Sequence, residues 1–166
     1  GDICDEKAIN DIFLTHRPQI VFHAAAYKHV PMLQNQIRET MRNNTLGTLS
    51  VANASIAAEV EKFVLISTDK AVNPSSMMGV SKRLAEIVGQ LRNDTEKTKF
   101  ITVRFGNVLG SAGSVVPLFE RQIRQGGPVT VTDPSMTRYF MTVSEACQLI
   151  LQACVMGAGG EIFVLN

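Results

Sequence analysis

The sequence predicts an α/β protein whose core is a doubly wound parallel sheet, in one domain over residues 1–166. Short apolar, β-branched runs alternate along the chain with longer segments of helical periodicity. This alternation requires crossover connections, which place helices on both faces of a parallel sheet. At 45% apolar residues the chain is also able to bury a sizeable core. Together these observations indicate a single globular α/β domain.

The expected elements can be taken in order from the N-terminus. Asp5 is a suitable N-cap for a helix whose apolar positions Ile9, Ile12 and Phe13 recur at helical spacing before Pro18. The stretch KFVLIST at 62–68 is continuously apolar and β-branched, which predicts a strand buried on both faces. By the same criteria we expect helices at about 35–59, after Pro74, and at about 114–125 and 144–156, a buried strand at 19–26, and further strands at 99–106, 128–132 and 161–166.

Charge and composition exclude several classes of protein. The 16 basic and 15 acidic residues give a formal charge of +1 without a block of one sign, so we expect no nucleic-acid partner and no membrane contact by this segment. No apolar run approaches the ~18 residues of a membrane helix. Because no Cys or acid stands at ligand spacing, no metal site is expected. Cys4, Cys147 and Cys154 are odd in number and indicate reduced core thiols of a cytoplasmic protein.

Four consecutive polar residues lie at the end of the predicted strand at 62–68 and directly after it. Ser67, Thr68, Asp69 and Lys70 come directly after an apolar run, at the carboxyl end of the strand. In open parallel sheets this edge binds ligands. The pattern therefore predicts a binding or catalytic site, with a helix cap plus a surface ion pair as the alternative.

The helix after Pro74 has two unlike sides. At ~100° per residue, Lys82 and Met78 lie one turn apart, so they face the same space. The opposite side carries an apolar stripe, which we expect to face the core: Met77, Val80, Leu84, Ile87, Val88 and Leu91. Lys82 and Met78 are then expected on one wall of a cleft.

Seven segments, taken in order, resemble those of one family. They are GDI (1–3), HAAAYKHVP (23–31), NTLGT (44–48), STDKAVNP (67–74), MGVSK (78–82), VRFGNVLGSAGSVVP (103–117) and TRYFMTVSEA (137–146). The chain resembles the extended short-chain dehydrogenase/reductases, and within them the nucleotide-sugar 4,6-dehydratases of bacterial polysaccharide biosynthesis (CapD-like), which serve capsule, O-antigen and flagellin-glycan synthesis. The resemblance implies a Rossmann-like fold, with elements of a small substrate-binding region within about 107–142.

The resemblance also implies roles for particular residues. The catalytic positions are Thr68, Asp69, Lys70, Lys82 and Met78, of which Asp69 and Lys70 match the acid and base pair. The positions that bind NADP or NAD are Asp2, Ile3, Ala24, Ala25, Ala26, Lys28, Lys82, Phe105 and Gly106. The positions that bind the UDP-sugar are His29, Asn107 and Arg138, although a structural salt bridge explains Arg138 equally well.

Two departures from the family pattern stand out. The Gly-rich loop that holds the pyrophosphate of the dinucleotide is expected upstream of Gly1, so we expect a piece of a longer protein, incomplete at the N-terminus of the sheet and inactive by itself. The second departure is Met78, which replaces the tyrosine of the usual Tyr-x-x-x-Lys pattern. A thioether has no proton to exchange, but one branch of the family carries Met at this position.

These features predict a UDP-N-acetylglucosamine 4,6-dehydratase that forms a UDP-4-keto-6-deoxy sugar by transient hydride transfer to bound NAD(P). Two alternatives stay open: a dehydratase of the same family that inverts C5, and a dinucleotide-binding module without catalysis, in which Met78 marks the loss of chemistry. We also expect a homo-oligomer. The choice between NADP and NAD is open, as is anchoring of the parent protein in the inner membrane with this domain on the cytoplasmic side.

Overall fold

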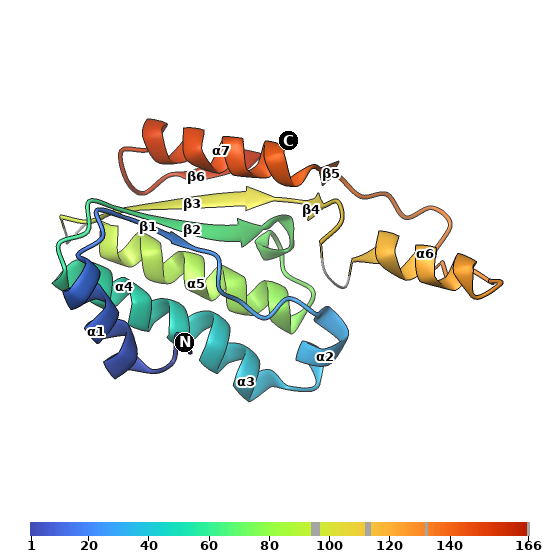
Figure 1. Cartoon of the computed structure of the whole chain (residues 1–166), viewed down its shortest axis with the longest axis horizontal. Coiled ribbons are helices and arrows are strands. Elements are labelled where there is room, and N and C mark those ends of the chain that lie inside the picture. The colour runs from blue at the N-terminus through green and yellow to red at the C-terminus, as the bar shows by residue number, and fades with distance from the viewer. Residues whose placement is uncertain (94–96, 112–113, 132, 166) are drawn as a thin grey trace.

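The computed structural model describes residues 1–93, 97–111, 114–131 and 133–165 (Figure 1). Its α-helices are α1 (Glu6–His16), α2 (Val30–Gln34), α3 (Ile37–Met41), α4 (Gly47–Ala57), α5 (Met77–Asn93), α6 (Val115–Arg124) and α7 (Val143–Met156). A π-helical turn, η1 (Arg42–Leu46), joins α3 to α4, and a 3-10 turn, η2 (Asp69–Ala71), follows β2. The strands are β1 (Ile20–His23), β2 (Lys62–Thr68), β3 (Lys99–Phe105), β4 (Asn107–Val108), β5 (Phe140–Met141) and β6 (Ile162–Leu165).

Four strands form one parallel sheet in the order β1-β2-β3-β6. The central strands β2 and β3 pair in register from Lys62 opposite Lys99 to Thr68 opposite Phe105. Their polar carboxyl ends therefore finish together at one edge of the sheet. The alternation of apolar strands and helices thus predicted the parallel α/β sheet correctly.

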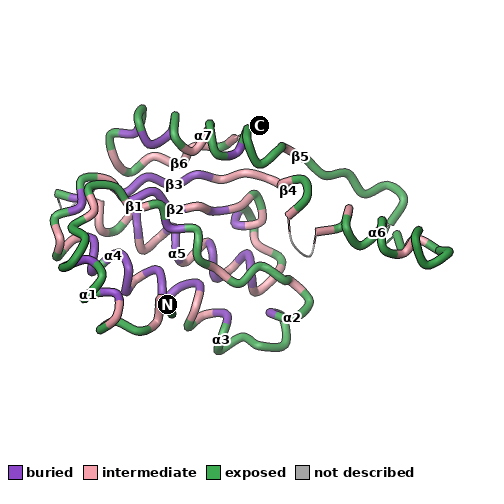
Figure 2. Tube along the Cα trace, viewed as in Figure 1, coloured by how far each residue is buried: buried purple, intermediate pink, exposed green. Residues whose placement is uncertain are grey.

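Helices cover both faces of the sheet (Figure 1). α1, α4 and α5 lie on one face, over a core that includes Phe13, Val51 and Phe63. α7 lies on the other face, over a core that includes Val64 and Ile101. Figure 2 shows buried residues gathered in the sheet and on the helices that face it. The doubly wound, Rossmann-like class is therefore confirmed.

The described residues of 107–142, which are 107–111, 114–131 and 133–142, leave the sheet and form a separate arm. β4 and β5 pair in parallel, with Asn107 opposite Phe140. Between them α6 extends away from the sheet, and none of its residues is buried (Figure 1). This arm is the region expected to bind substrate, and that assignment stays a prediction.

Two predictions about strands are wrong. Residues 128–131 are irregular instead of forming a strand, because the backbone N–H of Thr130 donates to Gln122 Oε1 at 3.1 Å. Thr132, in the same predicted strand, lies outside the described residues, as does Asn166 at the end of β6. β1 is not fully buried either: as an edge strand it leaves Phe22 44% exposed, since α7 covers β3 and β6.

The predicted orientation of α5 is reversed. The side toward the core carries small and charged residues: Met78, Gly79, Ser81, Lys82, Ala85, Glu86 and Gly89 are all buried. Of the apolar stripe, Val88 packs partly against the core, whereas Leu91 is 70% exposed. Small side chains allow α5 to approach the sheet closely, and the charged ones find partners there, so hydrophobicity does not decide the face.

The three cysteines differ in burial. Cys154 is buried, Cys4 is half-buried and Cys147 is exposed, so the expectation of core thiols is wrong for Cys147. Residues seven apart on an α-helix are rotated by ~20° from one another. At the margin of the buried face of α7 this difference is enough to place one thiol inside and the other in solvent.

Candidate active site

A cavity of about 580 Å³ lies at the carboxyl ends of β1, β2 and β3. Its walls come from the segment after β1, the turn after β2, the first turns of α5, the end of β3 and the arm at 107–142. Most of the predicted site residues line it: Ala24, Ala26, Lys28, His29, Thr68, Lys70, Met78, Lys82, Phe105, Gly106, Asn107 and Arg138. The structure thus brings together residues that are up to 114 positions apart between Ala24 and Arg138.

Four predicted site residues do not line this cavity. Asp69 lies beside it and is bonded to Lys70. Asp2 is exposed and pairs with Arg42 at 3.6 Å, while Ile3 packs against the core and Ala25 is exposed. The resemblance placed Asp2 and Ile3 at the adenine end of a dinucleotide, and this role stays a prediction.

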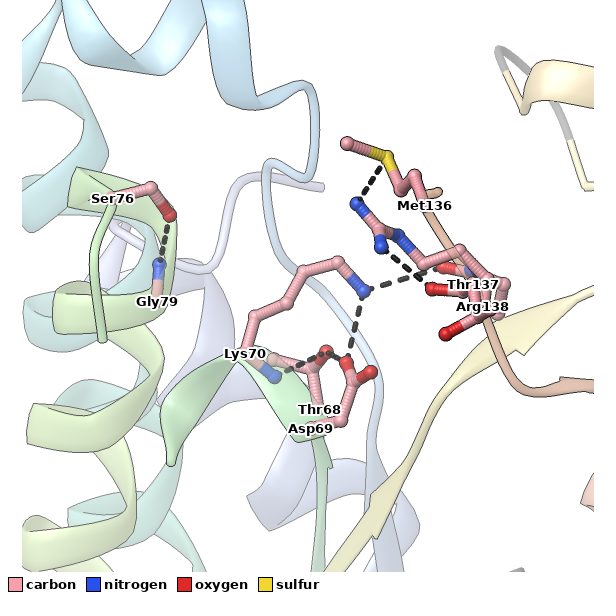
Figure 3. Close-up of polar contacts among 9 residues, drawn as sticks. Thr68, Asp69, Lys70, Ser76, Gly79, Met136, Thr137 and Arg138 are labelled. Carbon is pink, nitrogen blue, oxygen red and sulfur yellow. Dashed lines mark hydrogen bonds and ion pairs between the residues drawn. The ribbon is translucent and has the colours of Figure 1, made fainter. Parts of the chain in front are cut away.

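The turn after β2 holds three polar side chains in one hydrogen-bonded group (Figure 3). Thr68 Oγ1 caps the turn by accepting from the backbone N–H of Lys70 at 3.3 Å, and it donates to Asp69 Oδ1 at 2.9 Å. Lys70 Nζ donates to the same Asp69 oxygen at 2.9 Å and to Asn107 Oδ1 at 3.2 Å. Figure 3 shows the Lys70 side chain extending from β2 toward the arm that carries Met136 and Arg138.

The surroundings of Asp69 keep its carboxyl group ionised. Partial burial raises its pKa, but hydrogen bonds from Lys70 and Thr68 and the charge of Lys70 outweigh that effect, so the pKa lies below the ordinary value. In the resting site Asp69 is therefore available as a proton acceptor. The pair consists of a proton acceptor and a proton donor 2.9 Å apart.

Lys82 and Met78 form the buried wall of the cavity. They are 5% and 6% exposed, and both point from α5 into the space at the end of β2. Burial lowers the pKa of Lys82 to about 8, although the charge of Glu86 acts in the opposite direction. The Lys82 amine makes no hydrogen bond within the described part of the chain. Roughly a tenth of it is therefore neutral at pH 7 and able to accept a proton.

Gly79 sets the distance between α5 and the catalytic turn. A Cβ at this position would overlap the carbonyl oxygen of Lys70 and would touch Pro74 Cβ at 3.0 Å. The N–H of Gly79 donates to Ser76 Oγ at 3.2 Å at the start of the helix (Figure 3). The missing side chain thus lets the first turn of α5, and with it Met78 and Lys82, lie against the Thr68–Lys70 turn.

The cavity carries far more positive charge than the chain as a whole. Lys28, Lys70, Lys82 and Arg138 line it, and none of its described lining residues is Asp or Glu. The chain as a whole has a net charge of only +1. A concave site of one sign attracts ligands of the opposite sign. The cavity therefore suits an anionic ligand.

Arg138 is free of carboxylate partners in the described structure. Its guanidinium donates to the Thr137 carbonyl at 2.7 Å and contacts Met136 Sδ at 2.8 Å (Figure 3). No ion pair involving Arg138 is found among the described residues. Of the two interpretations of this residue, the structural salt bridge thus finds no support in the described residues, and the phosphate contact stays a prediction.

A family model described as polysaccharide biosynthesis protein matches residues 1–166, the whole chain. The chain belongs to this family. It is 56% identical over 167 residues to the capsular polysaccharide biosynthesis protein CapD of Staphylococcus aureus, covering 100% of this chain and 28% of CapD. It is 42% identical over 168 residues to a UDP-glucose 4-epimerase of Rickettsia rickettsii, covering 99% of this chain and 48% of that protein.

A solved structure supports the fold of this polysaccharide biosynthesis domain. DesIV, a dTDP-glucose 4,6-dehydratase from Streptomyces venezuelae solved with NAD and TYD bound, superposes with a TM-score of 0.92 at 22% identity. The match covers 99% of this chain and 56% of DesIV. At this identity the likeness shows the fold alone. The chain thus spans between about a quarter and just over half of the proteins that it resembles.

Sequence reasoning assigned no role to Asn44, which holds one wall of the polysaccharide biosynthesis domain's cavity. Asn44 lies fully buried in the π-helical turn η1. Its side chain accepts from the Tyr27 N–H at 2.7 Å and donates to the Tyr27 carbonyl at 3.0 Å and to Ser81 Oγ at 3.0 Å. These bonds fix the segment before Lys28 against α5. A π-turn within a helix often marks a functional site. Asn44 is the first residue of the NTLGT segment that resembles the family, and this is the signal in the sequence that could have identified it.

His23 stands near the cavity without lining it. The ring is 3% exposed, and its Nε2 lies 2.9 Å from Thr48 Oγ1, whose own proton goes to the Asn44 carbonyl at 2.7 Å. The Nε2–H therefore donates to Thr48, which fixes the tautomer. Burial, together with the charge of Lys82, lowers the pKa of His23 to about 4. His23 is thus a neutral structural residue at the end of β1.

The described residues have neither a metal-binding cluster nor a helix suited to span a membrane. They contain no group of three or more His, Cys, Asp or Glu side chains that could hold a metal ion. None of their helices combines the length and the apolar character that a membrane span requires.

Proposed function

We propose that the protein that contains this chain is a UDP-N-acetylglucosamine 4,6-dehydratase, which forms a UDP-4-keto-6-deoxy sugar for surface polysaccharide or glycan synthesis. The observation that carries the proposal is the grouping of Thr68, Lys70 and Lys82 around one cavity, with Asp69 bonded to Lys70. A 4,6-elimination needs a base for the C4 hydroxyl and a base and an acid for C5 and C6. The cavity supplies candidates for all three.

The charge of the cavity supports a nucleotide-sugar substrate. A UDP-sugar carries its negative charge on the diphosphate, and Lys28 and Arg138 line the cavity together with the catalytic lysines. A guanidinium can bind phosphate oxygens through two parallel donors. His29 and Asn107 offer further polar contacts to the sugar. The identity of the sugar rests on the family resemblance.

The residues present fit a nicotinamide dinucleotide, NAD or NADP. The short side chains of Ala24 and Ala26 leave room where they line the cavity after β1, and Phe105 and Gly106 line it at the end of β3. The unbonded Lys82 amine is a suitable donor to ribose hydroxyls. When bound, the dinucleotide supplies an acceptor for the C4 hydride and later returns that hydride to C6.

Lys82 is the proposed base for the C4 hydroxyl. Met78 occupies the position of the family's tyrosine and has no proton to exchange. Lys82 lines the same wall of the cavity, and its pKa of about 8 leaves roughly a tenth of the amine neutral at pH 7. Its neutral amine takes the hydroxyl proton while the hydride leaves C4. The buried lysine thus replaces the missing tyrosine.

Asp69 and Lys70 are the proposed groups for the elimination. The 4-keto group acidifies the C5 hydrogen, which passes as a proton to the ionised Asp69 carboxylate. Lys70 donates its proton to the C6 hydroxyl, which leaves as water. A proton then passes from Asp69 to Lys70 over the 2.9 Å between them, and this restores the pair. As the hydride returns to C6, C5 takes a proton from solvent, and Lys82 releases to solvent the proton that it took from the C4 hydroxyl, so the protons balance. The lowered pKa of Asp69 favours this assignment over the reverse one, with Asp69 as acid and Lys70 as base.

A UDP-sugar 4-epimerase is the second candidate, because one relative carries the name UDP-glucose 4-epimerase. Epimerisation uses the hydride step at C4 and has no need of an acid for C6. The bonded Asp69–Lys70 pair at the cavity therefore favours the dehydratase. Inversion of C5 by a dehydratase stays an alternative, as does a binding module without catalysis.

The test is to incubate the full-length protein with UDP-N-acetylglucosamine in D2O and to follow the sugar by NMR. We expect a 4-keto-6-deoxy product with deuterium at C5 and no net consumption of NAD or NADP. The configuration at C5 then separates retention from inversion. A C4 epimer that keeps its C6 hydroxyl would identify an epimerase, and tight binding of dinucleotide without turnover would identify a binding module.

We propose that this domain lies in the cytoplasm, where nucleotide sugars and dinucleotides are available. We also propose that the full-length protein is a homo-oligomer. Light scattering of the purified full-length protein tests the second point. A monomer at micromolar concentration would contradict it.

A further inference from the structure

Glu86 is a fully buried carboxylate on α5, with 0% of its surface exposed. Its Oε1 accepts from Ser67 Oγ at 2.6 Å and from Arg104 Nε at 2.8 Å. Its Oε2 accepts from Arg83 Nη1 at 3.0 Å and from Arg104 Nη2. Burial raises the pKa of Glu86, but these four hydrogen bonds and the charge of Arg104 outweigh burial and keep the group ionised.

Three of the four hydrogen bonds to Glu86 come from strands that end at the cavity, and the fourth comes from Arg83 on α5. Ser67 and Arg104 are opposite one another in the register of β2 and β3. Each directly precedes a residue that lines the cavity, Thr68 after Ser67 and Phe105 after Arg104. Glu86 itself lies one helical turn after Lys82. The Glu86 carboxylate therefore connects the ends of β2 and β3 to α5. These three segments carry the proposed acid, the proposed bases and the residues proposed to contact the cofactor.

Glu86 does not touch the space where substrate would bind. Neither Glu86 nor Arg83 nor Arg104 is among the residues that line the 580 Å³ cavity. An apolar residue of similar size is often as good for stability as a buried ion pair. The ion pair differs from an apolar residue in that its hydrogen bonds are directional. Two carboxylate oxygens with four donors accept only one arrangement of the strands and the helix.

Lys82 shares the cavity with the charged or titratable residues Tyr27, Lys28, His29, Lys70 and Arg138. Two further groups, Glu86 and His23, are coupled to the Lys82 amine through its charge. On its own helix Glu86 raises the pKa of Lys82, against the larger effect of burial. On β1 the His23 ring is neutral above a pH of about 4 and adds no charge. Replacement of Glu86 by a neutral residue of the same shape should therefore act on Lys82 as well as on the geometry.

We propose that Glu86 is a positioning residue for the reaction: its carboxylate holds the ends of β2 and β3 against α5 and so sets the placement of the Thr68–Lys70 turn relative to Lys82. The proposal rests on the function proposed above. It adds to that function a residue outside the cavity that controls how well the acid and the bases are aligned.

The test compares Glu86→Gln with Glu145→Gln in the full-length protein. Glu145 is the matched control, because its carboxylate accepts hydrogen bonds from Thr142 in the capping box of α7 and does not line the cavity. Three quantities are measured: kcat, KM, and the pH midpoint of Lys82 without substrate, read from its ¹³Cε resonance and assigned with Lys82→Arg.

For Glu86→Gln we expect kcat to fall at least ~10-fold with KM changed less than ~3-fold. The reason is that a shift of the Thr68–Lys70 turn relative to Lys82 disturbs the alignment of the reacting groups more than the binding of substrate. We expect the Lys82 midpoint to move to lower pH by at least about half a unit, because a negative neighbour is lost. The control should leave all three unchanged. The Lys82 midpoint is measured without turnover, so it still tests the role of Glu86 if the protein proves not to be a dehydratase.

A Glu86→Gln protein that matches the control in kcat and in Lys82 midpoint would overturn the proposal. Where Glu86→Gln fails to fold, Arg104→Lys replaces it, since it keeps the positive charge beside Glu86 but loses the two-donor fork, and Arg104 does not line the cavity. We expect Arg104→Lys to lower kcat at least ~3-fold at an unchanged KM. Unchanged kcat in that folded variant would equally contradict the positioning role.

Discussion

Two lysines share the cavity and differ in their surroundings. Lys70 lies on the short η2 turn with a side chain that is 35% exposed, and its amine is held by Asp69 and Asn107. Lys82 lies on the long helix α5, is 5% exposed and makes no hydrogen bond within the described residues. The amine of Lys70 donates hydrogen bonds to both of these partners, and the role proposed for this lysine is that of the acid. Burial lowers the pKa of Lys82, which suits its amine to accept a proton.

The largest effect is expected at Lys82. Lys82→Met removes the proposed C4 base and the ribose contact, so turnover should fall at least ~10³-fold. The same change should stabilise the folded protein at neutral pH, because a buried amine with a pKa of about 8 instead of 10.5 costs roughly 2 to 4 kcal/mol while it is charged. Turnover assays and denaturant unfolding measure the two effects.

The gain in stability from Lys82→Met should depend on pH in one direction. Below about pH 8 both folded and unfolded Lys82 are charged, so the wild type bears the full cost. Between about 8 and 10.5 the folded protein has lost the proton that the unfolded chain still binds, so wild-type stability rises with pH relative to the variant. A difference between the two proteins that is constant from pH 7 to 10 would contradict the lowered pKa.

The next effect should separate Asp69 from Lys70. Asp69→Asn and Lys70→Met should each reduce product formation at least ~10²-fold, because each removes one proton-transfer group. In D2O the Lys70 variant should still exchange the C5 hydrogen of the 4-keto intermediate, since Asp69 is the proposed base. The Asp69 variant should not. The opposite pattern of exchange would make Lys70 the base and Asp69 the acid.

A smaller effect is expected from the spacing between α5 and the catalytic turn. Gly79→Ala should lower kcat ~10-fold and destabilise the protein by about 1 to 3 kcal/mol, because the new methyl group would overlap the Lys70 carbonyl. Gly89→Ala is the matched control on the same helix, where a Cβ would meet Phe100 at an ordinary 3.8 Å. It should be neutral or stabilising by up to ~1 kcal/mol. Equal kcat and equal stability of the two variants would show that the missing side chain of Gly79 does not set the spacing between α5 and the turn.

The smallest effect is expected at Met78. Met78→Leu is nearly volume-conserving, so a residue that only lines the wall beside Lys82 should tolerate it with less than ~3-fold loss of turnover. A loss comparable to that of Lys82→Met would give the thioether a role in the chemistry. Steady-state kinetics of the full-length protein decides between the two.

The sequence predicted the parallel sheet, because KFVLIST and KFITVRF are apolar enough to be buried strands whatever covers them. It also led us to expect a site at 67–70, and the structure places a cavity at this edge of the sheet, while the binding or catalytic role of these residues stays a prediction. It failed where tertiary partners decide burial. No pattern shows that Glu86 will meet Arg104, and that pair is what allows α5 to bury its charged side.

Contacts between residues far apart in the sequence also limited how much of the candidate site could be predicted. Asn107 and Arg138 were identified through the family resemblance, and only folding shows that Asn107 bonds to Lys70. Asn44 acts through the backbone of Tyr27, a contact between residues 17 apart that depends on the π-turn η1. Hydrogen bonds of this kind leave no periodic signal in the sequence.

The contrast between the two lysines is tested most directly by the pH dependence of kcat/KM for UDP-N-acetylglucosamine, measured with the full-length protein. This quantity reports the pKa of essential groups in the free enzyme. If neutral Lys82 is the C4 base, kcat/KM should rise tenfold per pH unit below a midpoint near pH 8 and then level off. A rate that is constant between pH 6 and 9, or a Lys82→Arg variant with the same profile and rate, would show that another group removes the C4 proton.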